Sequence, residues 1–173
     1  MGIIVDSGAI IPYASGAPFQ LATRGSGIPF IIQMIGFGTS ESTLFNVTID
    51  LTEVPDNLAF SVPRDGIITS IAAFFSSTVS LSIPGSTITI TAQLWSSPTP
   101  DNIFTPVAGT AVTLAPPLTG EIVPGTTSKG LLENLAIPVT AETRLLMVFS
   151  ATAEGETLVT AVTGNASAGV NID

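Results

Sequence analysis

The sequence of 173 residues contains no histidine, no cysteine and only four basic residues. Histidine is the commonest general base and the commonest metal ligand. Its absence therefore makes general-base catalysis and a metal site less expected. Without cysteine the chain has no disulfide framework and no thiolate metal site. Binding to nucleic acid requires clusters of Lys and Arg, and the four basic residues are far apart in sequence. We therefore expect no nucleic-acid partner.

Long apolar runs are also missing. The longest, such as Leu145–Phe149, are far too short to cross a bilayer. The N-terminal stretch lacks the basic region and the apolar length of a signal peptide. Asp6 stands where N-myristoylation requires Ser or Thr. These absences predict a soluble domain with no membrane partner.

Charged residues are scarce: they make up 10% of the chain, whereas hydrophobic residues make up 45% and the net charge is −9. A typical charged fraction is about 25%. Either Ser and Thr hydroxyls cover the surface, or part of the apolar surface is buried against other copies of the chain, and the two can hold together. The length suits one domain, and no linker interrupts it, so we expect a single domain over residues 1–173.

What the sequence does contain is a hydrophobic pattern with a period of two. Apolar and polar residues alternate in residues 45–52 and again in residues 87–94. Successive strand side chains point to opposite faces, so each stretch predicts a strand with one face on a core. Clusters of Gly, Pro, Asn and Asp recur at intervals of about 10 to 15 residues, as in sandwiches and barrels of short strands. The residues thus predict an all-β sandwich or barrel.

Two segments depart from this alternation because they are apolar at almost every position: Ile67–Phe75 and Leu145–Phe149. A strand with two apolar faces must be covered on both sides. In a sandwich of two sheets the facing sheet covers one side only. We therefore expect a second copy of the molecule to cover the other side of both segments.

The stretch Pro63–Gly66 places an Arg and an Asp between two apolar runs. It predicts a tight turn that joins residues 58–62 to residues 67–75, with Pro63 at the first corner and Gly66 in the left-handed region. Arg64 then has two interpretations. Its charge either keeps the turn solvated or contacts an acid across a subunit boundary.

Catalytic and metal-binding patterns are weak. Ser128 and Lys129 could form a nucleophile pair, but adjacent residues on a strand point apart, so we expect no enzyme. The turns Asp56-Asn57 and Asp101-Asn102 are rich in the oxygen ligands that Ca²⁺ prefers, yet the spaced Asp pattern of a calcium loop is missing. Asx-type turns are the favoured interpretation, and no cofactor is expected.

Trp95 is the one aromatic residue that we would test as a sugar-binding platform, because it ends an alternating strand on the polar side. The alternative is that Trp95 closes the edge of the core. A recognition module that binds glycans or a partner protein through loops such as Pro98–Pro106 is therefore the second functional hypothesis.

Several blocks, in order along nearly the whole chain, are similar to one family. They are IIPYASG (10–16), FSVPRDG (60–66), ITITAQL (88–94), LTG (118–120), IPVTA (137–141) through TRLLMVFSA (143–151), and ASAGV (166–170). The chain resembles the C-terminal domain of BclB-type exosporium glycoproteins, the collagen-like surface proteins of bacterial endospores. The Val-Pro-Arg-Asp-Gly and Thr-Arg-Leu-Leu blocks are the most specific.

The resemblance implies a jelly-roll β-sandwich like the heads of tumour necrosis factor and C1q, assembled as a homotrimer. It also implies a location on the spore surface, where the trimer would cap a collagen-like stalk beside other exosporium or spore-appendage proteins. No Gly-X-Y triplets occur within this chain, so it is either the head alone or a member without a stalk. The residues expected at the trimer interface are Ile67, Ile71, Phe75, Leu145, Met147, Phe149 and Arg64.

Overall fold

The computed structural model describes residues 8–173, so the expectations that concern Asp6 and the extreme N-terminus lie outside the described residues. Every regular element within that range is a β-strand, and no helix there is long and apolar enough to cross a membrane. The strands are β1 (Ala9–Ala14), β2 (Phe19–Arg24), β3 (Ile28–Ile35), β4 (Ser40–Leu44), β5 (Ile49–Asp50), β6 (Phe60–Ser61), β7 (Gly66–Ser77), β8 (Leu81–Ser97), β9 (Ile103–Pro106), β10 (Val112–Thr113), β11 (Leu118–Ile122), β12 (Thr127–Leu132), β13 (Ile137–Val139), β14 (Arg144–Gly155) and β15 (Ala161–Ile172).

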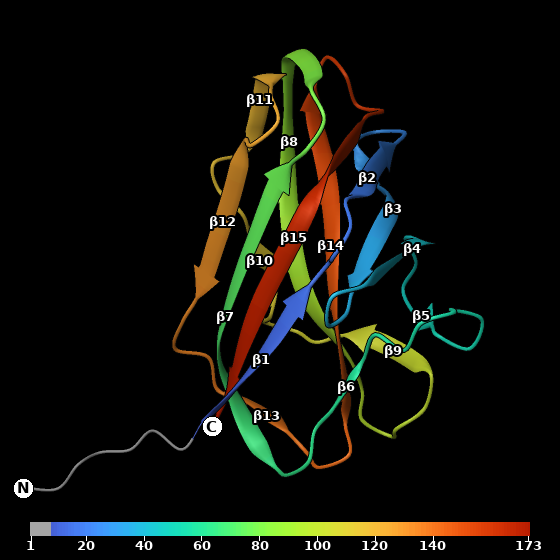
Figure 1. Ribbon diagram of the computed structural model, residues 1–173, viewed down its shortest axis with the longest axis vertical. Helices are drawn as coiled ribbons and strands as arrows, with labels where there is room; N and C mark the ends of the chain where they lie inside the picture. Colours follow the sequence, from blue (N-terminus) through green and yellow to red (C-terminus); the bar gives the residue numbers. More distant parts are fainter. Residues whose placement is uncertain (1–7) are drawn as a thin grey trace, which may run out of the picture.

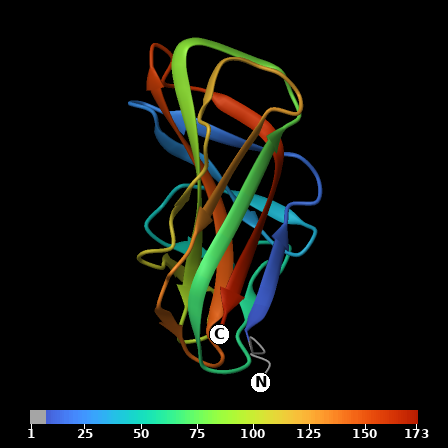
Figure 2. The same ribbon diagram turned by 90° about the vertical axis from the view of Figure 1, so that its left-hand side faces the viewer.

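The strands form two layers, as Figure 1 shows. The front layer contains β12, β7, β15 and β1 in this order, and the back layer contains β3, β14 and β8, with β4 and β9–β11 at its edges. The named strands pair antiparallel throughout, and β2 pairs with both β15 and β3, so it connects the layers at one end. Figure 2 shows the two layers from the side. The prediction of an all-β jelly-roll sandwich is confirmed.

The strand expected over residues 87–94 is the central part of β8. Ile88, Ile90, Ala92 and Leu94 are buried, and the intervening residues are half-buried. This strand pairs with β14 over twelve positions, from Arg144 opposite Ser97 to Gly155 opposite Ser86. The prediction that the apolar residues of this stretch face the core is therefore confirmed.

The strand expected over residues 45–52 is wrong for most of its length. β4 ends at Leu44, and only Ile49 and Asp50 form a short strand, β5. Phe45 and Val47 are 45% and 77% exposed, and the Val47 amide donates to the Asn46 side chain at 2.7 Å. After Phe45, whose amide donates to the Phe30 carbonyl at 2.9 Å, the chain leaves β3 and crosses to β9, so residues 46–48 have no neighbouring strand to pair with.

Strand β14 is covered on both faces by its own chain. Leu145, Met147 and Phe149 lie in the main core between the two layers. Leu146 and Val148 point the other way, into a second core. The remaining buried members of that second core come from β3, β5, the segment 51–59, β8 and β9: Ile32, Met34, Ile49, Leu51, Leu58, Ala59, Trp95 and Phe104.

The expectation that Leu145, Met147 and Phe149 face neighbouring subunits is therefore corrected. All three side chains are at most 1% exposed within one protomer, so almost none of their surface remains for a partner to cover. The physical reason is that the segment 49–59 and β9 pack over the outside of the back layer. A second layer of the same chain supplies the cover that we had assigned to a second copy.

Strand β7 has one buried and one exposed face. Ile71 and Phe75 point into the main core and are fully buried, so the prediction that they lie at a subunit interface is also corrected. Ile67 and Phe74 are 45% and 40% exposed. The side chains of this apolar run therefore alternate between the main core and the surface. Those on the surface are not covered by the same protomer.

The stretch Pro63–Gly66 is not a hairpin turn. The strand before it, β6, pairs with β14, whereas β7 pairs with β15, so this stretch crosses from the back layer to the front layer. Gly66 does not have a positive φ angle. Its role is close approach, because a Cβ atom there would lie 2.7 Å from the Asp173 carbonyl oxygen and from the Ile172 side chain.

Arg64 lies on the surface beside this crossing and donates to the backbone carbonyls of Asp65 and Ile172, at 3.1 and 3.4 Å. Asp65 accepts a 2.8 Å hydrogen bond from the Ala141 amide. The two charged residues therefore tie the crossing to the end of β15 and to the turn before β14. The contact of Arg64 with an acid of another subunit stays a prediction.

Candidate functional site

The outer face of the front layer carries the side chains that point away from the main core on four paired strands. The strand registers arrange them in rows across the sheet. One row is Pro12, Gly169, Ala72 and Leu131; the next is Ala14, Ser167, Phe74 and Lys129; the row below the first contains Ile10, Asn171 and Ser70.

This outer face is apolar and almost uncharged. Ile10 is 74% exposed, Leu131 59% and Phe74 40%. Lys129 is the one charged side chain in these rows. The Asn171 amide is already bonded to the Thr69 hydroxyl at 2.7 Å and, at the end of the chain, to the Asp173 carboxylate at 2.9 Å. Little polar surface would therefore have to lose water if another apolar surface covered this face.

The side chain of Phe74 determines the surface shape of the outer face. Its ring stands between two shallow hollows, one of about 140 Å³ toward Ser167 and Gly169 and one of about 520 Å³ toward Lys129 and Leu131. Gly169 has open space above it, since the nearest atom to an added Cβ belongs to Ile10 at 4.0 Å. A ridge with a hollow on either side is a shape that can interlock with a second apolar surface.

The sequence analysis selected Ile71 and Phe75 on the buried face of β7 and did not identify the exposed residues of this outer face. Residues 72–75 are apolar at every position, so the sequence does not show which of Phe74 and Phe75 is the outer one. Leu131 and Ile10 were missed because their strands are short and give little period-two signal. Of the predicted interface residues, Ile67 and Arg64 are exposed.

A second feature is a cluster around Arg144, at the first residue of β14. Its guanidinium donates to the backbone carbonyl of Asp101, to Asn102 Oδ1 at 2.8 Å and to Asn57 Oδ1 at 2.9 Å. The same group lies over the Phe104 ring, 5.2 Å from its centre. The structure thus brings together the two oxygen-rich turns that we weighed as calcium sites, and the cation between them is the side chain of Arg144.

The turn of Asp101 shows the Asx-type geometry that was the favoured interpretation. Its carboxylate accepts from the Ser97 hydroxyl at 2.7 Å and from the Ile103 amide at 2.8 Å. These hydrogen bonds, with a smaller contribution from the Arg144 charge, hold the pKa of Asp101 below its usual value. Among residues 8–173, no three His, Cys, Asp or Glu side chains are placed to hold a metal ion.

A polar cavity of about 260 Å³ opens beside this cluster. Its lining residues are Leu51, Val54, Pro55, Asp56, Asn57, Asn102 and Arg144. The cavity belongs to the back layer, on the opposite side of the sandwich from the outer face. The sequence marked the two Asx turns but gave no signal that Arg144 would join them.

Trp95 is not available to a ligand, which corrects its assignment as a sugar platform. It is 4% exposed and belongs to the second core. β9 pairs alongside it, with Pro106 opposite Trp95, so the loop that was to present the ring covers it instead. The alternative, a Trp that packs at the edge of a core, describes its position.

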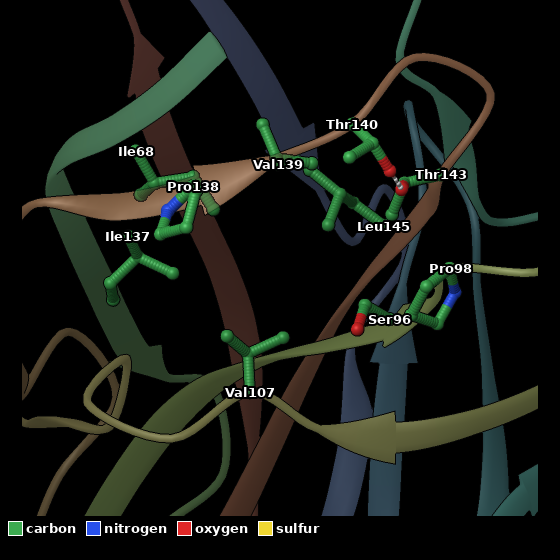
Figure 3. Close-up of a pocket in the computed structure, with 10 residues that line it drawn as sticks. All are labelled: Ile68, Ser96, Pro98, Val107, Ile137, Pro138, Val139, Thr140, Thr143 and Leu145. Carbon is green, nitrogen blue, oxygen red and sulfur yellow. Dashed lines mark hydrogen bonds between the residues drawn. The ribbon is translucent and has the colours of Figure 1, made fainter. Parts of the chain in front are cut away.

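Another cavity, of about 200 Å³, lies at the end of the sandwich near β13 (Figure 3). Ile68, Val107, Ile137, Val139 and Leu145 make most of its wall apolar. The hydroxyls of Thr140 and Thr143 are hydrogen-bonded to each other at 3.0 Å. No titratable side chain is found among the described residues that line it. It offers an apolar recess without an acid or a base.

Ser128 and Lys129 point apart, as expected of neighbours on a strand. Ser128 is buried and donates to the Pro116 carbonyl at 2.6 Å, whereas Lys129 is exposed on the outer face. The two side chains therefore do not form a nucleophile pair.

Comparison with known proteins gives one informative relative. No family model matches the chain. The chain is 35% identical over 152 residues, 82% of its length, to Collagen-like protein 1 of Acanthamoeba polyphaga mimivirus. The chain is a homologue of one segment of a collagen-like protein. It spans 16% of that relative's length.

Similar solved structures are remote. One is the structure of infectious bursal disease virus Gx strain, with a TM-score of 0.40, 11% identity and coverage of 95% of this chain and 32% of the other. Another is the stem and receptor binding domain of the spike protein P1 from bacteriophage PM2, with a TM-score of 0.34, 10% identity and full coverage of both chains. Neither likeness is close enough to assign a function.

Proposed function

We propose that this domain is a non-enzymatic structural head of a collagen-like protein and that it self-associates as a homotrimer through the outer face of the front layer. The observation that carries the proposal is the uncharged, apolar character of that face, with Ile10, Phe74 and Leu131 exposed. Contiguous apolar surface of this kind marks interaction sites in soluble proteins. The role requires no cofactor.

Three copies are proposed because of the relative. The relative is named as a collagen-like protein, and it is about six times longer than the segment that it shares with this chain. A collagen triple helix contains three chains. A domain attached to such a stalk occurs three times at its end, so a surface that joins three copies would hold the chains together and fix their register.

The geometry of the chain ends suits attachment to a stalk. β1 pairs with the end of β15, with Ala9 opposite Ile172, so the chain enters the domain at the lower end of the front layer in Figure 1. A stalk that joins before β1 would lie next to the outer face. Contact between copies there would keep three stalk strands close to one axis.

The exosporium location is proposed on the sequence blocks shared with BclB-type glycoproteins, and other exosporium or spore-appendage proteins are the proposed neighbours. An antibody raised against the domain should label intact endospores of the source organism. Labelling confined to the spore interior would contradict this location while leaving self-association untouched.

The test of self-association is sedimentation equilibrium on the domain at micromolar concentration. We expect a trimer for the wild type and a folded monomer for the double variant Phe74→Asp, Leu131→Asp. The matched control is Leu44→Asp, Val47→Asp, which places two charges on exposed apolar residues elsewhere. The control should remain a trimer, and circular dichroism should show intact strands in all three proteins. A wild-type monomer, or a trimeric Phe74 and Leu131 variant, would refute the proposal.

A further inference from the structure

We propose that the polar cavity beside Arg144 is a binding site for a neutral saccharide, a function beyond self-assembly. The cavity lies between the segment 51–57, Asn102 and the start of β14, on the back layer. An assembly joined through the front layer therefore leaves it open.

Arg144 fixes the orientation of two amide side chains in the cavity. A guanidinium only donates hydrogen bonds, so the oxygen of each amide must face it. Asn102 and Asn57 obey this rule, with Oδ1 atoms 2.8 and 2.9 Å from the guanidinium nitrogens. Their Nδ2 groups are consequently turned away from Arg144. Neither Nδ2 group has a hydrogen-bond partner within residues 8–173.

The same wall supplies an acceptor. One carboxylate oxygen of Asp56 accepts from the Thr39 hydroxyl at 3.1 Å, and the other has no donor in the described part of the chain. A sugar hydroxyl both donates and accepts, so neighbouring hydroxyls on one ring are matched by a carboxylate beside amide donors. Asp56 with Asn57 and Asn102 makes such a set.

The cavity wall is mostly polar, and Val54 and Pro55 add a small apolar part to it, with Leu51 buried beneath. The C–H face of a pyranose ring can pack against this apolar part while its hydroxyls reach the polar wall. The volume of about 260 Å³ is just below the roughly 300–1,000 Å³ of sites for drug-sized ligands, and it suits a single sugar ring.

Charge favours a neutral ligand over an ion. The Asp56 carboxylate and the Arg144 guanidinium balance each other in the cavity wall, so an ion of either sign would meet a like charge there. A metal cation would need the oxygens of Asp101, Asn102 and Asn57 that already bind the guanidinium of Arg144. The cluster is held in place before any ligand arrives, which lowers the ordering cost of binding.

The probes are the methyl glycosides of glucose, galactose and mannose, titrated at millimolar concentration into ¹⁵N-labelled protein. We expect at least one of them to shift the side-chain amide signals of Asn57 and Asn102 in a saturable way. The variant Asp56→Ala should weaken this binding about tenfold or more, because it removes a charged acceptor. Glu53→Ala is the matched control: it removes an exposed acid of the same loop that does not line the cavity, and it should bind as the wild type does.

Two results would overturn the proposal: no shift of either amide signal with any of the three glycosides, or equal affinity of Asp56→Ala and the wild type. The backbone amide spectrum of Asp56→Ala reports in the same experiment that the variant is folded. Sedimentation of Asp56→Ala separates this proposal from the previous one, since loss of saccharide binding should leave the trimer intact.

Discussion

Tyr13 is the single tyrosine of the chain, and it connects the two layers. It lies on β1 of the front layer, and its hydroxyl donates to the carbonyl of Leu145 on β14 of the back layer, at 3.3 Å. The side chain is almost completely buried, and this burial raises the pKa of Tyr13 above its usual value. The phenol of the folded protein therefore stays protonated under conditions where an exposed tyrosine ionises.

This burial predicts that the stability falls at alkaline pH. Above the usual tyrosine pKa of about 10, the unfolded chain releases the phenol proton and the folded chain retains it. The folded state then binds more protons, so the free energy of unfolding decreases as pH rises. Tyr13→Phe should cost about 1 kcal/mol at neutral pH, because the hydrogen bond is lost, but should flatten the alkaline decline. Urea unfolding at neutral and alkaline pH measures both effects, and an equally steep decline in the variant would contradict the assignment.

At the scale of single elements, β14 shows how far the sequence could predict the fold. Its run of apolar residues correctly indicated a strand covered on both faces. The sequence did not show what covers the second face, because most of the covering segment 49–59 is irregular and the alternation at its start does not show where the segment packs. The apolar run of β14 is compatible with cover by a second copy and equally with cover by another segment of the same chain.

The two interpretations of β14 differ in their energetics. Met147 faces the main core and Leu146 the second core, and both are fully buried. Met147→Ala and Leu146→Ala should each lower the free energy of unfolding by about 2–5 kcal/mol. Thr152→Ala, at an exposed site on the same strand, should change it by less than about 0.5 kcal/mol. Chemical denaturation gives these values, and a Met147→Ala protein of normal stability that no longer associates would restore Met147 to the interface.

At the scale of the whole molecule, pairing of distant segments limited what the sequence could predict. The all-β class followed from local alternation, but residues 45–52 alternate and still form no continuous strand, since pairing partners are set by the fold. The cluster around Arg144 also depends on contacts between distant segments, because Asn102 and Asn57 lie 42 and 87 positions away from Arg144 in the chain. Local patterns located each oxygen-rich turn separately and could not place them together.

The proposed assembly should not weaken at high salt, because Lys129 is the one charged side chain in the rows of the outer face. Sedimentation equilibrium between about 0.01 and 1 M NaCl covers a fall in the Debye length from about 30 to 3 Å. We expect the trimer to persist or to tighten at high salt, since ion pairs do not hold the proposed interface and salt screens the repulsion between copies that each carry a net charge of −9. Dissociation at high salt would show that charged contacts, with Arg64 as the first candidate, carry the assembly.

The pairing of β1 with the end of β15 has a practical consequence for anyone who builds with this domain. Both strands reach the same pole of the sandwich, and the loops that join β7 to β8 and β14 to β15 occupy the other pole (Figure 1). A reporter fused before Ala9 and a cargo fused after Asp173 would therefore crowd each other. A peptide inserted beside Val79 or Val159, which are exposed in those loops, would instead be displayed at the free end.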